Sequence, residues 1–486
     1  MFENLLNLPY LFLFIPLIFS AINILQNYKA TNTLITVLVI SFILVLSFYL
    51  MPEVLPNKTL QSKIGNDVLF IMTEYKIDFL NLVFLVMIFF TKLIAFLFFD
   101  NDSVYTKKLN FFFGIYLVNY FSICGILLSN NIFNIFLYIE FYSFTLYNLM
   151  SDYKKLSYTM VAYKYYNNGV LGSLFLIFFV FLVYLTFGSA DIDYITANTN
   201  IIKNDYLYNL SIFIFLAAVS FKFFSFNLYF SEVLKSSEIT NLLFINILFS
   251  DIIIGVYVMR KFIYSLFDLN LLFNIFHINY FFYLVGSILI IYSSIRIYMR
   301  RNLLPTIYSL SLIMLGYVII LIGMNNDYSF ISMTSFLINH VLVNFLFYLI
   351  TALCVYLYGK SDTPILYSFV KYNYIIYAIV LSKLCLPIAS GFNSSWNYIL
   401  SVIEEKSYYL FLPFIIEKSF MIFLFVRHYL VFTKEVKEEY TYLDIHKQIS
   451  LNTNYMLSIF VLFSLIVIVS LFENSISNAF LKFIKG

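Results

Sequence analysis

Charged residues are scarce in this chain. They make up 11% of the 486 residues, whereas hydrophobic residues make up 62%. Soluble domains carry about 25% charged residues. A water-soluble fold of this size could not cover its surface with so few charges, because large exposed apolar patches associate with other apolar surfaces. The composition therefore excludes a soluble globular protein and predicts a surface that faces lipid.

Cysteines and the usual chemical motifs are also scarce. Cys124, Cys354 and Cys385 lie in apolar stretches without CxxC or Cys/His spacing, so we interpret them as small core residues. The sequence has no Gly-rich phosphate loop and no HExxH, and the small net charge of +3 gives no nucleic-acid footprint. We expect no catalytic residue, no metal site and no cofactor in this chain, and no nucleic-acid partner.

Long apolar runs fill the chain instead. A membrane-crossing helix needs about 20 apolar residues, and the sequence contains about 14 such runs. Strand-like alternation is absent, which predicts an all-α polytopic membrane protein rather than a β-barrel. The opening residues lack the basic region of a signal peptide, so the first run is expected to be a retained span. The runs lie near residues 7–25, 32–51, 76–99, 109–129, 131–150, 158–187, 206–230, 239–265, 271–295, 304–323, 330–358, 365–402, 408–433 and 450–472.

The segments between the runs are short. The longest polar stretches, residues 52–74, 190–205 and 434–451, are expected to be connectors. Loops after odd-numbered runs carry more Lys and Arg than loops after even-numbered runs. The positive-inside rule therefore predicts that odd loops face the cytoplasm or the mitochondrial matrix and that both termini lie on the opposite side.

Three ionisable residues are stranded in apolar runs of the first half. Burial of a charge in lipid costs several kcal/mol unless the charge is paired or neutralised, so such residues are usually functional. Glu140 shares a helical face with Ser143 and Tyr147, and it reads as a structural ion pair or as a proton carrier. Lys222 is either a lysine reaching the interface or a buried lysine controlled by an acid. Asp251 fits pairing with a lysine and proton carriage equally well.

The second half has its own stranded groups. His340 lies on a polar stripe with Asn344 and Thr351, where a local hydrogen bond and a functional role are both open. Glu417 and Lys418 are adjacent in one run, so their backbones direct them to different faces of a helix. At least one of them is expected to meet a partner on another helix or a water-filled cavity.

The twelfth run is interrupted by Pro387 and Gly391. Proline removes a backbone donor, and glycine allows the chain to turn out of a helix. Broken helices at membrane depth persist where they line a cavity, and they commonly mark transport sites.

Three stretches resemble one known family. Residues 136–143 read FLYIEFYS, residues 162–173 read AYKYYNNGVLGS, and residues 250–262 read SDIIIGVYVMRKF. Their order and spacing are similar to the antiporter-like subunits of proton-pumping respiratory NADH:ubiquinone oxidoreductase (complex I), most closely subunit 2. Weaker similarity extends the match to about residues 105–435.

The resemblance implies an antiporter-like fold with two inverted five-helix repeats, helices 4–8 and 9–13, each containing a broken helix. It divides the chain into N-terminal helices at 1–104, a first repeat at 105–266, a second repeat at 267–435, and a C-terminal connector with the last helix at 436–486. Glu140 matches the fifth-helix glutamate of the family, and Lys222 matches the seventh-helix lysine.

Two positions depart from the family pattern. Asp251 stands where the family has its eighth-helix lysine, which reverses the charge, and Ser395 stands where it has its twelfth-helix lysine. Lys383, Lys418 or His340 are candidates to substitute for the missing lysines.

The resemblance implies a proton-translocating membrane-arm subunit of complex I in the mitochondrial inner membrane. The composition, rich in Phe, Tyr, Ile and Asn, fits this compartment because it suggests AT-rich coding, as in organelle genomes. NADH, flavin, iron–sulfur clusters and ubiquinone are then expected elsewhere in the complex. Expected partners are other membrane-arm subunits, including antiporter-like ones, and lipids such as cardiolipin. Alternatives are subunit 4 of the same complex, a subunit of a multisubunit cation/proton antiporter, and a non-pumping structural subunit. The expected proton-transfer residues are Glu140, Lys222, Asp251, His340, Lys383 and Lys418.

Overall fold

The structure is a computed structural model of the whole chain, and it consists of two compact units. One unit comprises Met1–Val233 with Leu242–Phe276, and the other comprises Leu234–Asn241 with His277–Gly486. We call them unit 1 and unit 2. The structure describes residues 8–26, 28–54, 59–64, 73–97, 109–151, 156–199, 206–224, 249–299, 303–358, 379, 382–386, 389–432, 459–469 and 472.

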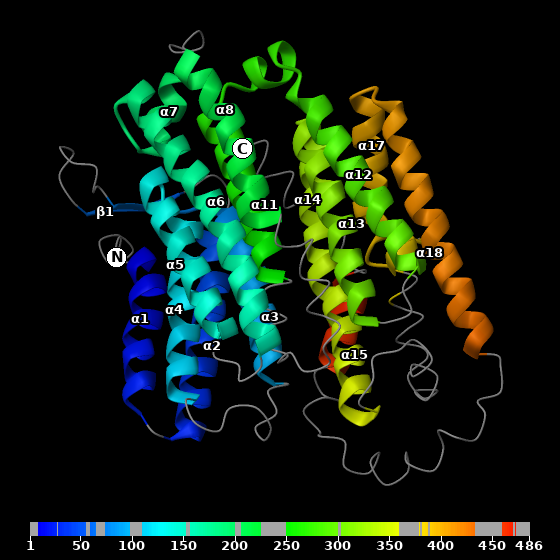
Figure 1. Ribbon diagram of the computed structural model, residues 1–486, viewed down its shortest axis with the longest axis horizontal. Coiled ribbons are helices and arrows are strands. Elements are labelled where there is room, and N and C mark those ends of the chain that lie inside the picture. Colours follow the sequence, from blue (N-terminus) through cyan, green and yellow to red (C-terminus); the bar gives the residue numbers. More distant parts are fainter. Residues whose placement is uncertain are drawn as a thin grey trace. The chain divides into compact units, whose positions relative to one another are not determined.

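Unit 1 is a helical bundle with one small hairpin (Figure 1). In the bundle α1 packs on α4, α4 on α5, α2 on α3, and α6 on α8. Its elements are α1 (Leu8–Leu25), α2 (Lys29–Val54), β1 (Leu60–Ile64), β2 (Thr73–Ile77), α3 (Phe79–Leu97), α4 (Leu109–Leu128), α5 (Ile132–Ser151), α6 (Leu156–Phe187), α7 (Ile192–Asn198), α8 (Tyr206–Val219), the π-helical turn η1 (Ser220–Phe224), α11 (Asp251–Leu266) and the π-helical turn η3 (Leu271–Ile275).

Unit 2 is entirely helical over its described residues. The helices α12 and α13 pack closely on each other, as do α14 and α17. Its elements are α12 (Ile278–Met299), α13 (Leu303–Met324), α14 (Asp327–Asn339), the π-helical turn η4 (His340–Asn344), α15 (Phe345–Tyr358), α17 (Phe392–Glu404), the 3-10 turn η6 (Tyr408–Leu410) and α18 (Phe411–Phe432). A short apolar helix follows at Ile459–Val469.

Nine helices among the described residues are long and apolar enough to cross a membrane. The prediction of an all-α, multi-span membrane protein is confirmed. The larger predicted total of about 14 spans includes runs that fall partly outside the described residues, such as 239–265 and 365–402. The proposed repeat boundaries stay a prediction.

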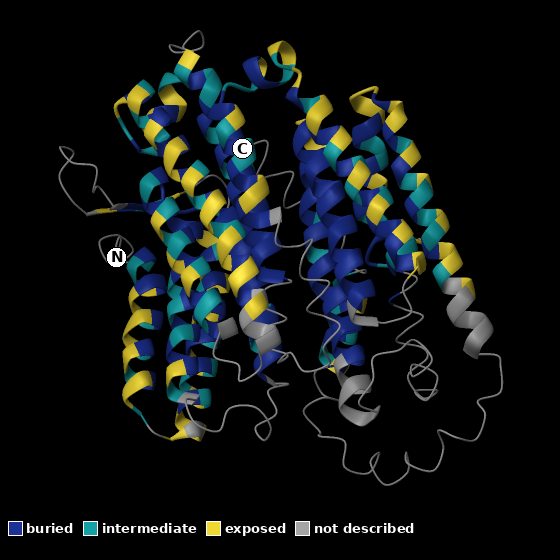
Figure 2. Ribbon diagram, in the orientation of Figure 1, coloured by how far each residue is buried: buried dark blue, intermediate teal, exposed yellow. Residues whose placement is uncertain are grey.

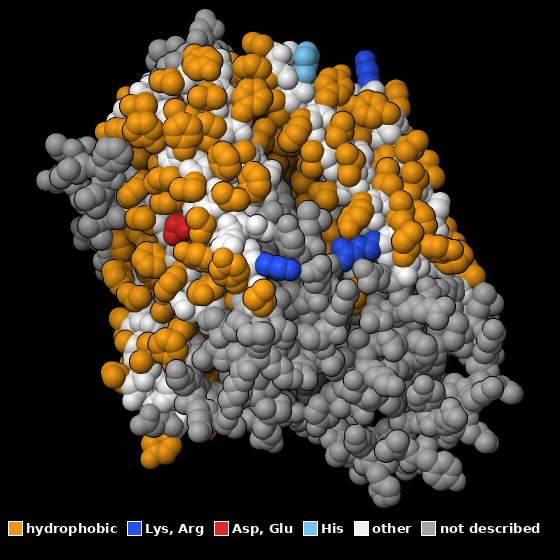
Figure 3. All heavy atoms as spheres, in the orientation of Figure 1, with side chains coloured by type: hydrophobic (Ala, Val, Ile, Leu, Met, Phe, Trp, Pro, Cys, Tyr) orange, Lys and Arg blue, Asp and Glu red, His pale blue; other side chains and the backbone are white. Residues whose placement is uncertain are grey.

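Burial separates central helices from outer ones. A helix that is apolar on every side must be buried in protein or surrounded by lipid. In α13 the whole span from Pro305 to Met324 is buried, whereas most of α1, α2, α6 and α12 is not (Figure 2). The exposed side chains are mainly hydrophobic, and charged groups are few on the face shown in Figure 3. The outer helices therefore present an apolar surface suited to lipid or to partner subunits.

Two of the expected connectors contain regular structure. The connector at residues 52–74 forms most of an antiparallel hairpin in which Leu60 pairs with Ile77 and Ile64 with Thr73. The connector at residues 190–205 contains α7, which Asp191 caps by accepting a hydrogen bond from the Asp193 N–H. The connector at 434–451 lies outside the described residues.

The twelfth run is interrupted, as the sequence predicts. A short helical turn ends at Cys385, whose φ of +59° lies in the left-handed region, and α17 begins at Phe392. A β-carbon on Gly391 would lie 2.1 Å from the Ser382 carbonyl oxygen, so only glycine allows this close approach. Pro387 lies outside the described residues.

Candidate functional site

Glu140 and Lys222 form an ion pair inside unit 1. The Lys222 Nζ lies 2.8 Å from Glu140 Oε1, and it also donates to Ser143 Oγ at 3.2 Å and to Ser173 Oγ at 2.7 Å. The Lys222 side chain is 4% exposed and that of Glu140 is 34% exposed. All three ammonium protons therefore have acceptors, which offsets the cost of burying the charge. Lys222 is a buried, paired lysine rather than one that reaches the interface.

Local backbone features bring this pair together. Glu140 and Ser143 lie one turn apart on α5, so they face Lys222 together. Lys222 lies in the π-helical turn η1, a helix irregularity that often occurs at functional sites. A β-carbon on Gly172 of α6 would lie 2.7–2.8 Å from the backbone of Lys222. The absence of a side chain at Gly172 lets η1 lie directly against α6, beside Ser173.

Asp251 lies next to the same cluster. Its carboxylate is buried and accepts a short hydrogen bond from the Tyr142 hydroxyl of α5. It interacts electrostatically with Lys222. Helix α11, which Asp251 begins, packs on η1, α3 and α4. The structure therefore joins Glu140, Lys222 and Asp251 in one buried polar cluster, which we call the unit 1 cluster.

The unit 1 cluster includes a lysine that the sequence analysis missed. Lys92 of α3 is completely buried and donates to Asn119 Oδ1 at 3.2 Å. Its Nζ lies 4.6 Å from the centre of the Tyr120 ring, within range of a cation–π contact. Lys92 interacts electrostatically with Asp251. The signal was present in the sequence, because Lys92 interrupts the apolar run at 76–99.

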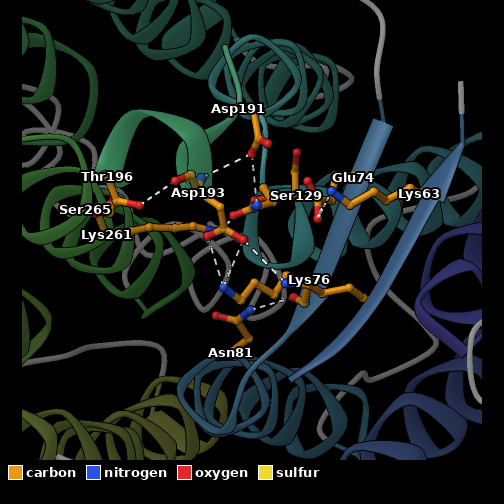
Figure 4. A network of polar contacts seen from close by, with 12 residues as sticks. Lys63, Glu74, Lys76, Asn81, Ser129, Asp191, Asp193, Thr196, Lys261 and Ser265 are labelled. Atoms are coloured by element: carbon orange, nitrogen blue, oxygen red, sulfur yellow. Dashed lines mark hydrogen bonds and ion pairs between the residues drawn. The ribbon is translucent and has the colours of Figure 1, made fainter. Parts of the chain in front are cut away.

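A second polar network lies where the segments joining the unit 1 helices meet (Figure 4). Lys76 of β2 pairs with Asp193 of α7 at 3.1 Å, and Lys261 of α11 donates to the Ser129 carbonyl at 2.7 Å. Three of these segments follow the second, fourth and sixth predicted spans, and Lys261 lies near the end of the eighth. The sequence predicts that all four lie on one side of the membrane, and this orientation stays a prediction.

The same network affects two pKa values outside the membrane spans. A hydrogen bond to Glu74, at 3.1 Å, raises the pKa of Lys63. Burial raises the pKa of the Asp191 carboxyl, and the nearby charge of Glu74 adds to the effect. Asp191 also accepts from Asn130 Nδ2 at 3.2 Å. The network thus ties the hairpin, the α4–α5 turn and α7 together by opposite charges and hydrogen bonds.

Unit 2 contains a separate cluster. Lys418 Nζ lies 3.0 Å from Glu417 Oε2, so the neighbouring side chains of α18 meet although their backbones diverge. Lys418 also donates to the Lys383 carbonyl at 3.0 Å and to Cys385 Sγ at 3.1 Å. The Tyr317 hydroxyl of α13 donates to Glu417 Oε2 at 3.2 Å. Both members of the pair therefore meet partners on other segments, as the sequence suggested.

His340 lies at the start of the π-helical turn η4 and is buried. Its Nδ1 lies 2.6 Å from Asn344 Nδ2, and it interacts electrostatically with Lys383. The polar stripe predicted from His340 and Asn344 is therefore a direct contact. His340, Lys383 and Lys418 come together in unit 2 as a second cluster, and Ser395 is buried on α17.

Within the described parts of the chain, no group of three or more His, Cys, Asp or Glu residues could hold a metal ion. The chemistry that the two clusters offer is the binding and transfer of protons, because they consist of carboxylates, amines, an imidazole and hydroxyls.

Comparison with known proteins agrees with this architecture. The fold is similar to a chain of the membrane-bound sulfane sulfur reductase, an archaeal respiratory membrane complex, with a TM-score of 0.83 at 14% identity, covering 98% of this chain and 96% of that one. It is also similar to a chain of the Mrp complex from a Dietzia species, with a TM-score of 0.81 at 14% identity and coverage of 98% and 96%. A chain of respiratory complex I from Thermus thermophilus gives 0.73 at 14% identity, with coverage of 96% and 99%.

No curated protein matches the sequence. Residues 129–421 match the family described as NADH:quinone oxidoreductase/Mrp antiporter, transmembrane. These residues include both clusters except Lys92. The chain is an antiporter-like, multi-span membrane protein that belongs to the NADH:quinone oxidoreductase/Mrp antiporter family.

Proposed function

We propose that this chain translocates protons as an antiporter-like subunit of a respiratory membrane complex, with Glu140 and Lys222 as the controlling pair. The observation that carries the proposal is the buried Lys222 ammonium, held 2.8 Å from the Glu140 carboxylate in the helical bundle of unit 1. Such charges are expensive in lipid and are usually kept for function.

The mechanism follows from the geometry of the pair. Glu140 stabilises the protonated form of Lys222 by direct contact. When a conformational change in the complex moves Glu140 away, Lys222 loses its only anionic hydrogen-bond partner among the described residues. The remaining serine acceptors stabilise the ammonium less well than a carboxylate. The proton then leaves toward Asp251.

Unit 2 is proposed to contribute the second set of proton carriers. His340 and Lys383 interact electrostatically, and Lys418 donates to the Lys383 carbonyl. His340 lies where α14 passes into η4, Lys383 lies where the run at 365–402 is interrupted, and Lys418 lies on α18. Irregular helices at membrane depth persist where they line a polar path.

The exposed face of α5 around Glu140 is proposed to contact a partner subunit. The side chain of Glu140 is 34% exposed, and exposed Leu137, Phe141 and Phe144 surround it on α5. A carboxylate facing lipid at this depth would be costly. A neighbouring subunit that covers this face would remove the cost and would connect Glu140 to the rest of the complex.

The complex that we propose is complex I of the mitochondrial inner membrane, with this chain as subunit 2. The order and spacing of the stretches at 136–143, 162–173 and 250–262 support the choice. Other membrane-arm subunits and cardiolipin are the proposed partners, and the redox cofactors are proposed to lie in other subunits. A Mrp-type cation/proton antiporter is the second candidate, because the fold matches that of the Dietzia Mrp chain with a TM-score of 0.81.

The test is Glu140→Gln in the intact complex, in sealed native membrane vesicles. We expect proton uptake per turnover to fall by roughly tenfold or more, because loss of a charge-assisted hydrogen bond is worth about 1.5–3 kcal/mol. Assembly is measured in parallel by native gel electrophoresis. Glu404→Gln, at an exposed position on α17, is the matched control. Unchanged uptake in Glu140→Gln would refute the role.

The same vesicles separate the two candidate complexes. Complex I predicts proton uptake driven by NADH that does not need a sodium gradient. A Mrp-type antiporter predicts proton movement driven by a sodium gradient in the absence of NADH. A structural subunit predicts normal activity after replacement of both Glu140 and Lys222 by neutral residues.

A further inference from the structure

Lys92 is the most deeply buried cation among the described residues of unit 1. Its side chain is completely enclosed, although α3 belongs to the N-terminal helices and lies before the part of the chain that matches the family. The ammonium lies over the rings of Tyr116 and Tyr120, at 5.2 and 4.6 Å from their centres. An enclosed charge in a membrane span needs a reason, because neutral residues of similar volume are cheaper there.

Asp251 provides the link from Lys92 to the proton path. Its carboxylate interacts electrostatically with both Lys92 and Lys222. The Tyr142 hydroxyl donates to it, and Tyr142 lies on α5 between Glu140 and Ser143. One carboxylate therefore lies in the electrostatic field of two buried lysines that come from different helices.

We propose that Lys92 is a second proton-carrying lysine of the unit 1 cluster, which receives the proton of Lys222 by way of Asp251. This inference rests on the proposed function. The path of unit 1 would then run from η1 through α11 to α3, so that a helix outside the family match supplies a carrier.

A hydrogen-bonded chain holds Lys92 in position. Lys92 donates to Asn119 Oδ1 at 3.2 Å, and Asn119 Nδ2 donates to Thr145 Oγ1 at 2.9 Å. Thr145 in turn donates to the Tyr142 carbonyl at 2.7 Å. Helix α5 thus contacts Lys222 through Glu140 and Ser143, and contacts the Lys92 side through Tyr142 and Thr145. A shift of α5 would act on both lysines.

Lysine at position 92 suits the role of a proton carrier. Arginine keeps its proton under nearly all conditions, whereas a buried lysine can release one. In the transfer, the Lys222 ammonium gives a proton to the Asp251 carboxylate, leaving a neutral amine and a neutral acid. Lys92 must first have passed its own ammonium proton onward, which leaves a neutral amine. The acid then gives its proton to this amine. The carboxylate is restored, Lys92 becomes the ammonium, and the net charge of the cluster is unchanged.

The test compares two replacements of Lys92 in the intact complex. Lys92→Met should lower proton uptake per turnover by roughly tenfold or more, as expected when a proton carrier is removed. Lys92→Arg keeps a positive charge near Asp251 but does not release its proton. We expect Lys92→Arg to assemble like the wild type and still to show low uptake.

Lys406→Met is the control for the substitution itself. It makes the same change at an exposed lysine and should leave uptake normal.

The competing explanation is that Lys92 only neutralises Asp251. In that case Lys92→Arg, which keeps the positive charge, would show uptake within about twofold of the wild type, and the proposal would be overturned. Failure of this proposal is distinguishable from failure of the proposed function. If Glu140→Gln and Lys222→Met abolish uptake while Lys92→Arg does not, only the role of Lys92 is wrong.

Discussion

Replacing Gly172 by alanine should separate Lys222 from Glu140 without substituting either residue. The added β-carbon would lie 2.7 Å from the Lys222 backbone nitrogen and 2.8 Å from its Cα. Non-bonded carbon atoms are in optimal van der Waals contact when their centres are about 3.5–4.0 Å apart. The backbone of η1 therefore has to move away from α6 by about 0.8 Å, because backbone atoms, unlike a flexible side chain, cannot rotate out of the way.

The displacement is large on the scale of the ion pair. The Lys222–Glu140 distance of 2.8 Å would lengthen toward about 3.6 Å, where a hydrogen bond no longer counts as formed. A charge-assisted hydrogen bond contributes about 1.5–3 kcal/mol. Because a third of the Glu140 side chain is exposed and the lysine side chain can partly follow, we take the lower end, about 1.5 kcal/mol. That corresponds to roughly tenfold in an equilibrium constant.

The assay is proton uptake per turnover in sealed vesicles, with assembly of the complex measured in parallel. Gly172→Ala should reduce uptake about tenfold and leave the amount of assembled complex nearly unchanged. Gly169→Ala is the matched control. It lies one turn earlier on α6, where an added β-carbon meets nothing within 4 Å. Both substitutions raise helix propensity by about 1 kcal/mol, so that effect cancels between them.

Equal uptake in Gly172→Ala and Gly169→Ala would refute the reasoning. It would mean that the contact between Lys222 and Glu140 does not limit proton transfer, or that η1 tolerates the added carbon without moving. A loss of uptake in both variants would instead point to a general sensitivity of α6.

Two further predictions concern the polar network around Asp191 and the interrupted helix before α17. Burial raises the pKa of Asp191, so ionisation of Asp191 disfavours the folded state. The loss of stability begins above the ordinary carboxyl pKa of 3.8 and is complete above the raised folded pKa. Asp191→Asn, which still caps α7, should therefore raise the melting temperature of the complex more at about pH 7 than at about pH 4, with a stability gain of less than about 1 kcal/mol. A gain independent of pH would contradict this prediction. Gly391→Ala would place a β-carbon 2.1 Å from the Ser382 carbonyl oxygen and 2.8 Å from Asn339 Nδ2, so we expect about 1–3 kcal/mol of destabilisation. The measurement is the amount of assembled complex, compared with that of Gly169→Ala. Normal assembly would show that the backbone around Cys385 relaxes to accept the added carbon.

The sequence identified the membrane spans and most of the stranded charges. The cost of placing a charge in an apolar run depends mainly on that run, so Glu140, Lys222 and Asp251 could be recognised without a partner. The interruption near Gly391 was equally visible, because glycine and proline act on their own backbone. Lys92 satisfied the same rule and was overlooked.

The hairpin at residues 60–77 was harder to find. Each strand has five residues and lies in a polar connector, too short for an alternating pattern to stand out. Its stability depends on partners elsewhere, such as the Lys76–Asp193 pair and the backbone bridge between Tyr75 and Ser129. Sequence periodicity carries no information about such contacts.

The sequence by itself determined which groups had to be satisfied inside the membrane, and only the tertiary structure decided which groups satisfy them. Lys222 meets Glu140 across 82 residues, and Asp251 meets Tyr142 across 109. The electrostatic interaction of Asp251 with two lysines depends on how α3, α5, α11 and η1 pack. Helix packing is set by the shapes of side chains on facing helices, such as the missing side chain at Gly172, and these matches arise only when distant segments meet.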